Sequence, residues 1–597
     1  MKKSYFILSN IFQKMDFVGL KIFFIVLLVC ILYNNNTLYS QSFYPDFKLV
    51  MGSISSDGVP FLTSDPSDNI YMAQQFSAEP IIGTQHFPKV YPKVILITKM
   101  NPSGEIVWSQ MLESNATPYL YSVKCKNGFV YCAGMFYDTL YYYNGSNTLD
   151  SLISKGKSDI FVFKYTVQGE FVDALSIGDT NYNFFTEMDV INNDYIFCGY
   201  FTSDLHFRNK NTGEDFTLEW NGSEENDKDI FLIRLDEDGN CIWAKRAGGM
   251  YDDDVYGMSV YNNEIYLTGL FRGRANFNTP SQNGANTVQA AGNVDMFLAK
   301  FDQYGNPHWV KRAGSKYTDE YGKAGSSNHD YGSDVEVNQN GVFVCGQSYL
   351  ECNFNTPYND DSNTILDEHG SFLAHYDYDG TFLWAKDLKL KYLASHKLKL
   401  SLNQNYIGLF SLYRYPISLY SYLTNDSITF PTPKSNDCFV SFYDFNGNFL
   451  NGNSFGYSGN DQLGNIVLTN YKIYVTSRFQ YSVFFNNGIQ DIDSLSSIGS
   501  FDGLLLRYPI PYQTSDTITP TVELKVFPNP ATDYIYLSVY PELTTPKYTI
   551  FDVLGRAVES GTVDNFFKQI NVKDYKSGIY IIRVYSKSPK TLRFIKN

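Results

Sequence analysis

The stretch IFLIRLDEDGNCIW, residues 230–243, carries the pattern that decides the fold. Apolar residues form a run at each end, and Asp-Glu-Asp-Gly between them supplies residue types that favour a tight turn. Gly239 provides the positive φ that such a turn requires, because it has no side chain to clash with the backbone. The stretch therefore predicts a β-hairpin of two strands.

The same hairpin pattern recurs five more times along the middle of the chain. Its turn glycines are Gly104, Gly169, Gly239, Gly305, Gly380 and Gly447, spaced 65–75 residues apart. Four of the five tryptophans share one position in the unit, namely Trp108, Trp243, Trp309 and Trp384. An aspartate precedes the hairpin at Asp159, Asp229, Asp295 and Asp437. A fixed period of this kind indicates a tandem array, and we expect the tryptophans to fill a shared packing position between repeats.

A second hairpin with an asparagine-rich turn follows each first hairpin, as in Val190–Phe201, Val260–Phe271 and Val337–Ser348. An apolar residue stands eight positions beyond its glycine or the equivalent position: Ile82, Tyr142, Phe207, Phe277, Phe354, Leu419 and Phe485. Two hairpins per unit make four strands, the number in one propeller blade. No helical pattern of 10–15 residues intervenes, which argues against a βαβ architecture.

The two ends of the array complement each other. Residues 47–90 supply only the later strands of a unit, and residues 502–510 supply only a first strand. A C-terminal strand that completes the N-terminal blade would close a ring and remove free sheet edges. We therefore predict a seven-bladed β-propeller over residues 41–513, with its first blade closed by residues 502–510. An open β-solenoid is the alternative, and the split unit argues against it.

Composition limits the functions that this chain can have. It has 597 residues, a formal net charge of −15 and 17% aromatic residues, which favours strands over helices. Residues 1–40 and 514–597 are each net positive, so the middle of the chain is strongly acidic. An acidic body argues against nucleic acid as a partner, because binding to phosphate needs clustered Lys and Arg.

The N-terminus predicts an export signal over residues 1–40. A 12-residue apolar run, Ile22–Tyr33, follows several lysines and precedes Asn34-Asn35-Asn36. A membrane-spanning helix needs about 20 apolar residues, so the run is typical of a signal peptide and no transmembrane anchor is expected. An uncleaved anchor is the alternative. Translation could start at Met1 or at Met15, and the sequence leaves this open.

Seven cysteines follow the signal, an odd number without CxxC spacing. Cys198 and Cys345 occupy one position in the repeat, each before a glycine. Small buried core residues are the favoured interpretation, and disulfide partners are the alternative.

The C-terminal end predicts a separate small β-sandwich over residues 522–597, preceded by the polar linker 514–521. Segments of alternating apolar residues are separated by turn signals, and Pro528-Asn529-Pro530 fixes a rigid turn near the start. The whole chain is thus predicted to be all-β, with a seven-bladed β-propeller followed by this sandwich.

Four motifs of this segment resemble the type A sorting domain of the type IX secretion system of the Bacteroidetes. They are the Phe-Pro-Asn-Pro start at residues 527–530, Leu-Gly-Arg at 554–556, Ser-Gly-Ile-Tyr at 577–580 and the lysine-containing end. Tyr575 stands where the family more often has leucine. The resemblance implies a partnership with the type IX machinery and passage through the periplasm, followed by secretion or attachment to the outer surface. An ordinary accessory sandwich is the alternative.

The propeller repeats themselves resemble those common in exported bacterial proteins, a likeness that implies a fold and no single activity. We find no catalytic, cofactor-binding or metal-binding motif, and we predict no such residues and no cofactor. Asp236–Gly239 and Asp377–Gly380 are weakly similar to calcium loops, but plain turns are favoured. Asp252-Asp253-Asp254 could bind a cation, but a solvated loop is favoured. His308 and His375 lie within the repeated hairpin and are interpreted as structural.

Two functions from different classes remain. The favoured one is a surface or secreted binding or adhesion module, which would hold a glycan or protein ligand on its aromatic-rich propeller. The alternative is an extracellular glycan-active hydrolase or lyase at the propeller channel. That enzyme would need carboxylates from different blades to converge in the channel, with raised pKa values.

Overall fold

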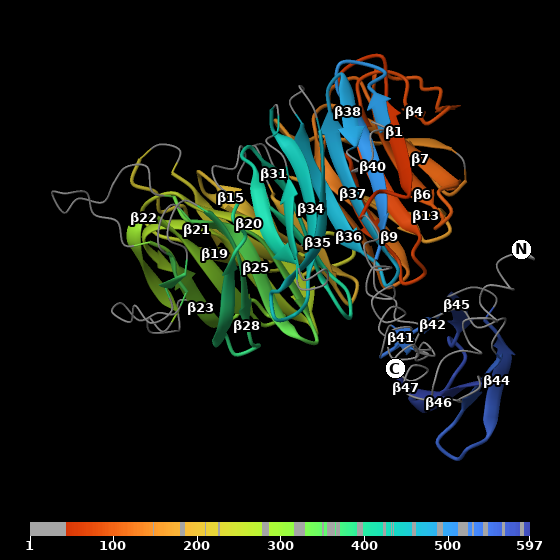
Figure 1. Ribbon diagram of the computed structural model, residues 1–597. Coiled ribbons are helices and arrows are strands. Elements are labelled where there is room, and N and C mark those ends of the chain that lie inside the picture. Colours follow the sequence, from red (N-terminus) through yellow and green to blue (C-terminus); the bar gives the residue numbers. More distant parts are fainter. Residues whose placement is uncertain are drawn as a thin grey trace, which may run out of the picture.

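The computed structural model describes residues 43–597 except 147, 179–184, 209–210, 225–226, 278–285, 316–328, 349–351, 355–363, 366–369, 391–397, 422–425, 431–432, 434, 457–460, 486–492, 511–522, 528–529, 541–546, 564–566 and 586–589. The predicted signal segment and the linker 514–521 lie outside the described residues. The described residues form strands and no helix, which confirms the prediction of an all-β protein (Figure 1).

Seven antiparallel sheets, here called sheets 1 to 7, each contain a core of four strands. From the innermost to the outermost strand, sheet 1 is β2 (Phe61–Ser64), β3 (Ile70–Phe76), β6 (Lys93–Met100) and β7 (Ile106–Ser114). Sheet 2 is β8 (Tyr119–Lys126), β9 (Phe129–Phe136), β12 (Asp159–Thr166) and β13 (Phe171–Ile177). Sheet 3 is β14 (Glu187–Ile191), β15 (Asp194–Phe201), β18 (Asp229–Leu235) and β19 (Cys241–Ala247).

The remaining ring sheets repeat this order. Sheet 4 is β20 (Asp253–Tyr261), β21 (Glu264–Asn276), β22 (Thr287–Phe301) and β23 (Pro307–Ala313). Sheet 5 is β24 (Tyr331–Asn338), β25 (Gly341–Ser348), β28 (Gly370–Tyr376) and β29 (Phe382–Asp387). Sheet 6 is β30 (Lys399–Leu402), β31 (Ile407–Tyr413), β34 (Asp437–Tyr443) and β35 (Phe449–Gly456). Sheet 7 is β36 (Gln462–Leu468), β37 (Lys472–Phe479), β40 (Asp502–Pro509) and β1 (Phe47–Gly52).

The innermost strands follow one another around a ring. Contacts run from β2 to β8, β14, β20, β24, β30 and β36 in turn, and β36 contacts β2 again. We infer from this cycle that the seven sheets are the blades of a closed propeller around a central channel. In every sheet the innermost strand runs the same way, so one face of the ring carries the short hairpin turns. We call it the turn face; the opposite face, which carries the longer connections, is the loop face.

Sheet 7 joins the two ends of the array. β1 pairs antiparallel with β40, from Phe47 opposite Arg507 to Met51 opposite Gly503, and Figure 1 shows the red β1 beside the blue β40. Asp46 adds ion pairs to Lys472 and Arg507. Three of the four core strands of sheet 7 therefore come from the C-terminal end of the array. Only its outermost core strand, β1, comes from the N-terminal end.

This division differs from the one expected from the sequence. We assigned residues 47–90 to one unit that lacked only its first strand, but β1 belongs to sheet 7 while β2 and β3 begin sheet 1. The repeat and the sheet are also out of phase, because each glycine-turn hairpin pairs with the asparagine-turn hairpin before it, as β18 does with β15. Strand pairing across the loop-face connection, which sequence spacing does not reveal, sets this phase.

Short hairpins extend the loop face. β4 (Ile81–Ile82) and β5 (Gln85–His86) extend sheet 7, β10 (Thr139–Tyr143) and β11 (Leu149–Ile153) extend sheet 1, and β38 (Ser482–Phe485) and β39 (Asp493–Ser496) extend sheet 6. Three separate pairs are β16 (Leu205–Arg208) with β17 (Asp215–Leu218), β26 (Cys352–Asn353) with β27 (Thr364–Ile365), and β32 (Ile417–Ser421) with β33 (Asp426–Phe430). Six of the seven predicted apolar positions in these connections are buried: Ile82, Tyr142, Phe277, Phe354, Leu419 and Phe485. The repeated apolar residue thus anchors each loop in the core.

The repeated tryptophans link neighbouring sheets. Each indole Nε1 donates to a carbonyl in the glycine turn of the next sheet: Trp108 to Val167 at 3.2 Å, Trp243 to Gln303 at 3.1 Å, Trp309 to Tyr378 at 3.1 Å and Trp384 to Phe445 at 3.2 Å. The turn glycine lies against the indole, where a Cβ would come within 2.7–2.9 Å of ring atoms. The shared packing position therefore lies at the boundary between sheets.

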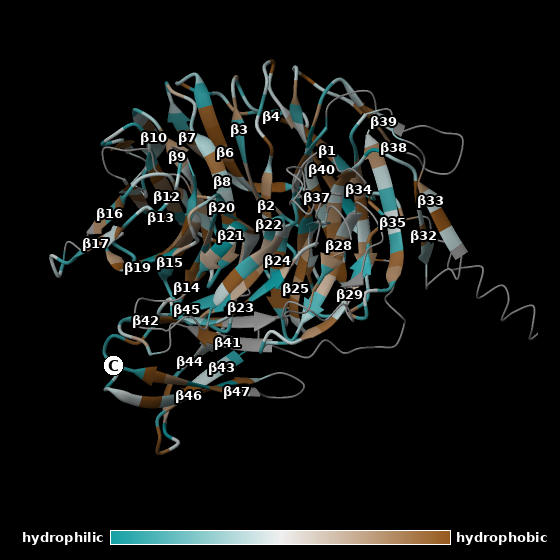
Figure 2. Cartoon of the chain, turned by 90° about the vertical axis from the view of Figure 1, so that its left-hand side faces the viewer, coloured by the Kyte–Doolittle hydropathy of each residue, from teal (hydrophilic) through white to brown (hydrophobic). Residues whose placement is uncertain are grey.

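The C-terminal segment forms two facing sheets. One contains β41 (Glu523–Phe527), β42 (Tyr534–Tyr540) and β45 (Phe567–Asn571). The other contains β43 (Lys547–Phe551), β44 (Ala557–Thr562), β46 (Gly578–Tyr585) and β47 (Lys590–Lys596). Ile535, Leu537, Ile550, Ile582 and Phe594 are buried in their common core. Figure 2 shows these strands grouped below those of the ring.

Candidate functional site

The central channel is lined by strand edges whose amides need acceptors, because no further strand pairs with them. Side chains of the preceding sheet supply these acceptors. The N–H of Cys125 donates to Thr63 at 3.3 Å, Met258 to Glu187 at 3.1 Å, Val260 to Asp189 at 3.2 Å, Leu400 to Asp334 at 2.9 Å and Leu468 to Ser401 at 2.8 Å. Three of the five acceptors are carboxylates, which make stronger hydrogen bonds than neutral groups.

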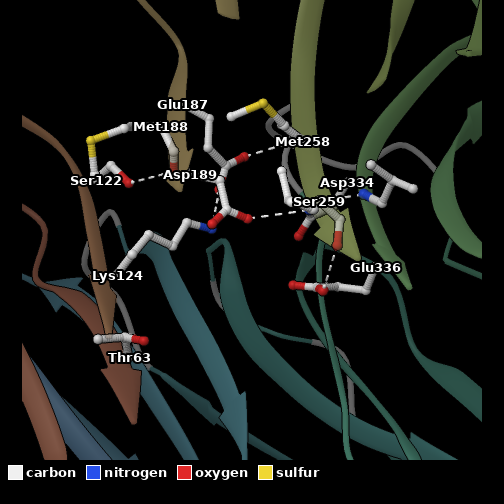
Figure 3. Close-up of polar contacts among 12 residues, drawn as sticks. Thr63, Ser122, Lys124, Glu187, Met188, Asp189, Met258, Ser259, Asp334 and Glu336 are labelled. Carbon is white, nitrogen blue, oxygen red and sulfur yellow. Dashed lines mark hydrogen bonds and ion pairs between the residues drawn. The ribbon is translucent and has the colours of Figure 1, made fainter. Parts of the chain in front are cut away.

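Lysines pair with the same carboxylates across the sheet boundaries. Lys124 Nζ lies 2.8 Å from Glu187 Oε1 (Figure 3). Lys126 Nζ lies 2.7 Å from Asp189 Oδ1. Lys399 lies 3.8 Å from Asp334. Each pair is thus both an ion pair and part of the hydrogen bonding that joins neighbouring sheets.

Glu336 differs from the other channel carboxylates. Ser259 Oγ donates to its Oε2 at 3.2 Å, and the structure gives it neither a lysine within ion-pair distance nor a main-chain donor among the described residues (Figure 3). The pKa of Glu336 is raised to about 8, mainly by burial; Asp334, Glu187 and Asp189 contribute to the rise, and Lys124 opposes it. At neutral pH this side chain is therefore mainly protonated and can donate a proton.

The channel charges interact across the ring. Burial alone would lower the pKa of Lys124, but Glu187, Asp189 and Glu336 together hold it above its usual range. Burial and Glu187 raise the pKa of Asp334, against the effect of Lys399. The side chains of Lys124 and Glu187 remain 25% and 17% exposed, so solvent reaches this network. Residues from sheets 2, 3, 5 and 6 therefore converge in one place.

A group of tyrosines lies at the loop face, where the innermost strands begin. Tyr119 and Tyr121 are on β8, Tyr137 follows β9, Tyr200 is on β15 and Tyr256 is on β20. We call these five residues the tyrosine arc. Because Tyr121 and Tyr256 precede Lys124 and Met258 on their strands, the arc lies on the loop-face side of the charged network.

The aspartate triplet does not form the solvated loop that the sequence favoured. Asp253 and Asp254 belong to β20 and are buried, and only Asp252 is exposed. Asp253 Oδ1 accepts the N–H of Arg272, and Asp254 pairs with Lys228 at 2.8 Å. The prediction of a solvated loop was wrong because strand β20 begins with polar residues, and the adjoining sheet covers them.

The two calcium-like segments are turns, as the sequence favoured. Asp236 Oδ1 accepts the N–H groups of Asp238 and Asn240, and Asp377 Oδ1 accepts those of Asp379 and Thr381. These side chains therefore mimic a main-chain acceptor and fix the turn. No group of three or more metal-ligating side chains occurs among the residues that the structure describes.

The histidine and cysteine interpretations also agree with the structure. The ring of His375 stacks on Phe343 at 4.1 Å and its Nε2 lies 2.8 Å from the carbonyl of Asn340. His308 lies on the surface, 3.0 Å from Glu264. All seven described cysteines are free, and every one except the half-buried Cys125 is buried.

Sequence reasoning missed the channel network. Its residues occupy alternate positions of the innermost strands, such as Glu187 and Asp189 on β14 or Asp334 and Glu336 on β24, and in other sheets these positions hold lysine or serine. A position that varies in this way has no repeated signature. A mixture of complementary charges on the first strand of successive units is the only signal that could have indicated it.

Comparison with known proteins identifies the C-terminal domain. Residues 525–597 match the model of the secretion system C-terminal sorting domain. This match confirms the predicted type IX sorting domain, and the chain is exported across the outer membrane to the cell surface or the medium. Within the described part of the chain, no helix has the length and apolar content needed to cross a bilayer.

Similarity to other proteins over longer stretches of the chain is distant. Over 276 residues it is 25% identical to the regulatory protein FlaEY of Caulobacter vibrioides, covering 45% of this chain and 27% of that protein. Phage phi92 endosialidase aligns over 92% of this chain and 87% of its own, with 9% identity and a TM-score of 0.30. PorZ, a surface component of the type IX secretion system of Porphyromonas gingivalis, aligns over 90% and 81%, with 10% identity and a TM-score of 0.18.

Proposed function

We propose that the exported protein is a ligand-binding or adhesion module, and that its propeller presents the binding surface. The sorting domain carries the chain to the cell surface or beyond, where a binding surface can meet external ligands. The observation that supports binding over catalysis is the use of the channel carboxylates. Glu187, Asp189 and Asp334 each accept a main-chain amide of the next sheet and pair with a lysine.

Carboxylates engaged in this way are needed to hold the ring together. Withdrawing any of them for chemistry would leave a strand-edge amide without its acceptor, which is costly in a buried site. The rings of the tyrosine arc lie on the face that carries the longer connections. Tyrosine offers a large contact area with little side-chain entropy to lose, which suits a binding surface.

To test binding, the protein is purified after export, whether or not the host has removed its sorting domain. It would be applied to an array of glycans and of extracellular matrix proteins, and retention would be compared with that of an unrelated exported protein. We expect saturable retention on at least one class of surface. Absence of retention on every surface would contradict the binding role.

A second candidate function is an extracellular glycan-active hydrolase or lyase, and Glu336 is the observation that favours it. A carboxylic acid that keeps its proton near neutral pH is the group that glycoside cleavage needs as a general acid. Asp334, two residues away on the same strand, also has a raised pKa. These raised pKa values are what such an enzyme needs, although both side chains lie on strand β24 and not on different blades.

The enzyme hypothesis is tested by incubating the protein and its Glu336→Gln variant with a panel of polysaccharides and measuring the release of reducing ends. Activity lost in Glu336→Gln but retained in Ser259→Ala would support catalysis by Glu336. If the wild-type protein binds polysaccharides without cleaving them, the binding role stands and the enzyme hypothesis fails.

A further inference from the structure

The tyrosine arc brings together side chains from three neighbouring sheets. The rings of Tyr119 and Tyr137 meet edge to face with centroids 6.1 Å apart. Burial raises the pKa of Tyr121, and the hydroxyls of Tyr137, Tyr200 and Tyr119 lie near enough to raise it further. Tyr200 is also close enough to Tyr256 to raise the pKa of that residue, although burial is the larger cause. The five residues therefore form one continuous group rather than scattered surface residues.

Parts of the arc remain open to solvent. The side chain of Tyr119 is 46% exposed, and the other four members are partly exposed. Many of the protein's other tyrosines, such as Tyr131 and Tyr195, are fully buried between sheets. The arc residues are thus not needed to fill the core to the same degree. A contiguous group of accessible rings and hydroxyls is a feature of binding sites.

Charge around the arc restricts the ligand. Asp252 is exposed beside it, and Asp254 is buried and pairs with Lys228 at 2.8 Å. Lys228 also lies over the ring of Tyr200, with its Nζ 4.1 Å from the centroid. Lys228 is therefore already engaged by a carboxylate and by an aromatic face. An anionic ligand at this place would meet the exposed Asp252 and a lysine whose charge is already paired.

From this arrangement we infer that the tyrosine arc is a binding site for an uncharged polysaccharide. The C–H faces of sugar rings stack on aromatic rings, and sugar hydroxyls exchange hydrogen bonds with tyrosine hydroxyls and with carboxylates such as Asp252. Tyr119 presents the most exposed ring of the arc, and Tyr121, Tyr137, Tyr200 and Tyr256 add partly exposed rings and hydroxyls. This inference rests on the proposed binding function and names its ligand class.

The test measures the affinity of the full exported protein for neutral polysaccharides (β-glucan, xylan and mannan) and for the anionic alginate and polygalacturonate. Three variants are compared with the wild type. Tyr119→Ala removes an open ring and Tyr256→Phe removes only a hydroxyl. Tyr304→Ala is the control, because Tyr304 is 61% exposed in a hairpin turn on the turn face. Thermal unfolding of each variant shows that the fold is intact.

We expect the wild type to bind a neutral polysaccharide, with affinity at least tenfold lower in Tyr119→Ala, reduced in Tyr256→Phe and unchanged in Tyr304→Ala. Ligand should also protect Tyr119 from nitration. If a glycan or protein is bound and the arc variants bind it as tightly as the wild type, the inference fails and the binding function stands. Tighter binding of the anionic polymers also overturns the inference, and absence of binding to any glycan or protein surface overturns both.

Discussion

A tryptophan in one sheet and a glycine in the next act as a single packing unit. At three boundaries that have the tryptophan, the indole covers a glycine whose φ is between 74° and 76°; at the fourth, φ is 91°. Asp173 replaces the tryptophan in sheet 2, and there Gly239 meets only aliphatic carbons of Ile177 and Leu175 at 3.8 Å. The indole therefore accounts for the close contact at the other boundaries.

Replacing Trp243 by alanine should lower the free energy of unfolding by about 3–5 kcal/mol, the usual range for removal of a large buried side chain. Trp243 is 7% exposed, and its loss removes both the contact with Gly305 and the hydrogen bond to Gln303. Chemical denaturation measures the change. Trp243→Phe is the matched control, because it keeps most of the packing and should cost less. An unchanged denaturation midpoint in Trp243→Ala would contradict the packing role.

The aspartates that precede the repeated hairpins have a related local role. Asp159, Asp229 and Asp295 accept main-chain N–H groups from the loop before them, and Asp502 does the same in sheet 7. Asp437 stands at the same position of sheet 6, but its Oδ1 is buried without a hydrogen-bond partner among the described residues. Burial raises the pKa of Asp437 to about 7.

This shift predicts that Asp437 weakens the fold as the pH rises. The folded state keeps the proton up to about pH 7, whereas an unfolded aspartate loses it near the ordinary pKa of 3.8. The contribution of Asp437 to stability therefore falls between about pH 4 and pH 7 and stays low above that range. Asp437→Asn should be more stable than the wild type by about 1–3 kcal/mol at pH 8, after allowance for solvent screening, and the advantage should shrink toward pH 4.

Urea unfolding of both proteins at several pH values measures that difference. Asp238→Asn is the control, because it removes a carboxylate from an exposed turn and should not change the pH dependence. An Asp437→Asn advantage that is equal at pH 4.5 and pH 8 would show that the carboxyl is not desolvated in the folded protein.

At the scale of strands, the closing pair of β1 and β40 determines whether the ring has free edges. β40 pairs with β37 on one side and with β1 on the other, so it lies inside sheet 7 rather than at its edge. Loss of β40 would expose the edges of both neighbours, which are then available for intermolecular pairing. The closing sheet thus depends on residues more than 450 positions apart.

Deleting residues 502–510 should unfold or aggregate the propeller, because sheet 7 loses its third strand and β1 loses its partner. Deleting residues 514–597 should leave the melting transition of the propeller unchanged. Calorimetry and light scattering of the two truncated proteins provide the comparison. Equal melting behaviour would contradict closure by β40.

Strand periodicity and turn residues were enough to predict most of the ring. Apolar runs on either side of Gly239 and its equivalents predicted the hairpins. The incomplete units at the two ends of the array predicted that residues 502–510 pair with the N-terminal region. The phase of the sheets was missed, because the pairing of β15 with β18 spans a loop of variable length. The site was missed for a similar reason: Lys124, Glu187 and Glu336 converge only when separate sheets meet around the channel.

At the scale of the whole molecule, the acidic propeller and the basic sorting domain have separate cores. Buried residues of the C-terminal core all come from residues 531–594, and the other cores contain none of them. In the sorting domain Val553 and Leu554 are 68% and 74% exposed, held in a turn whose Asp552 accepts the N–H of Leu554 and Arg556. The Leu-Gly-Arg motif is thus displayed on the surface rather than used for packing.

This separation predicts that the ring folds without the sorting domain but is not exported without it. Deleting residues 522–597 should leave a folded propeller in the periplasm, because the predicted signal segment would still direct the chain across the inner membrane while the sorting domain needed at the outer membrane is gone. Fusing residues 514–597 behind a signal peptide and a foreign domain should send that domain to the surface of a host with the type IX machinery. Cell fractionation and surface proteolysis locate both proteins.

Substitution of the displayed motif separates recognition from folding. Leu554→Ser changes an exposed side chain that contributes nothing to the core, so the sandwich should keep its stability while export falls. Ile550→Ser, on strand β43 that leads into this turn, removes a buried side chain and should lower export by unfolding the domain. If Leu554→Ser is exported as well as the wild type, the motif is needed only for the turn. Truncated protein that still reaches the medium would overturn the sorting role of the whole domain.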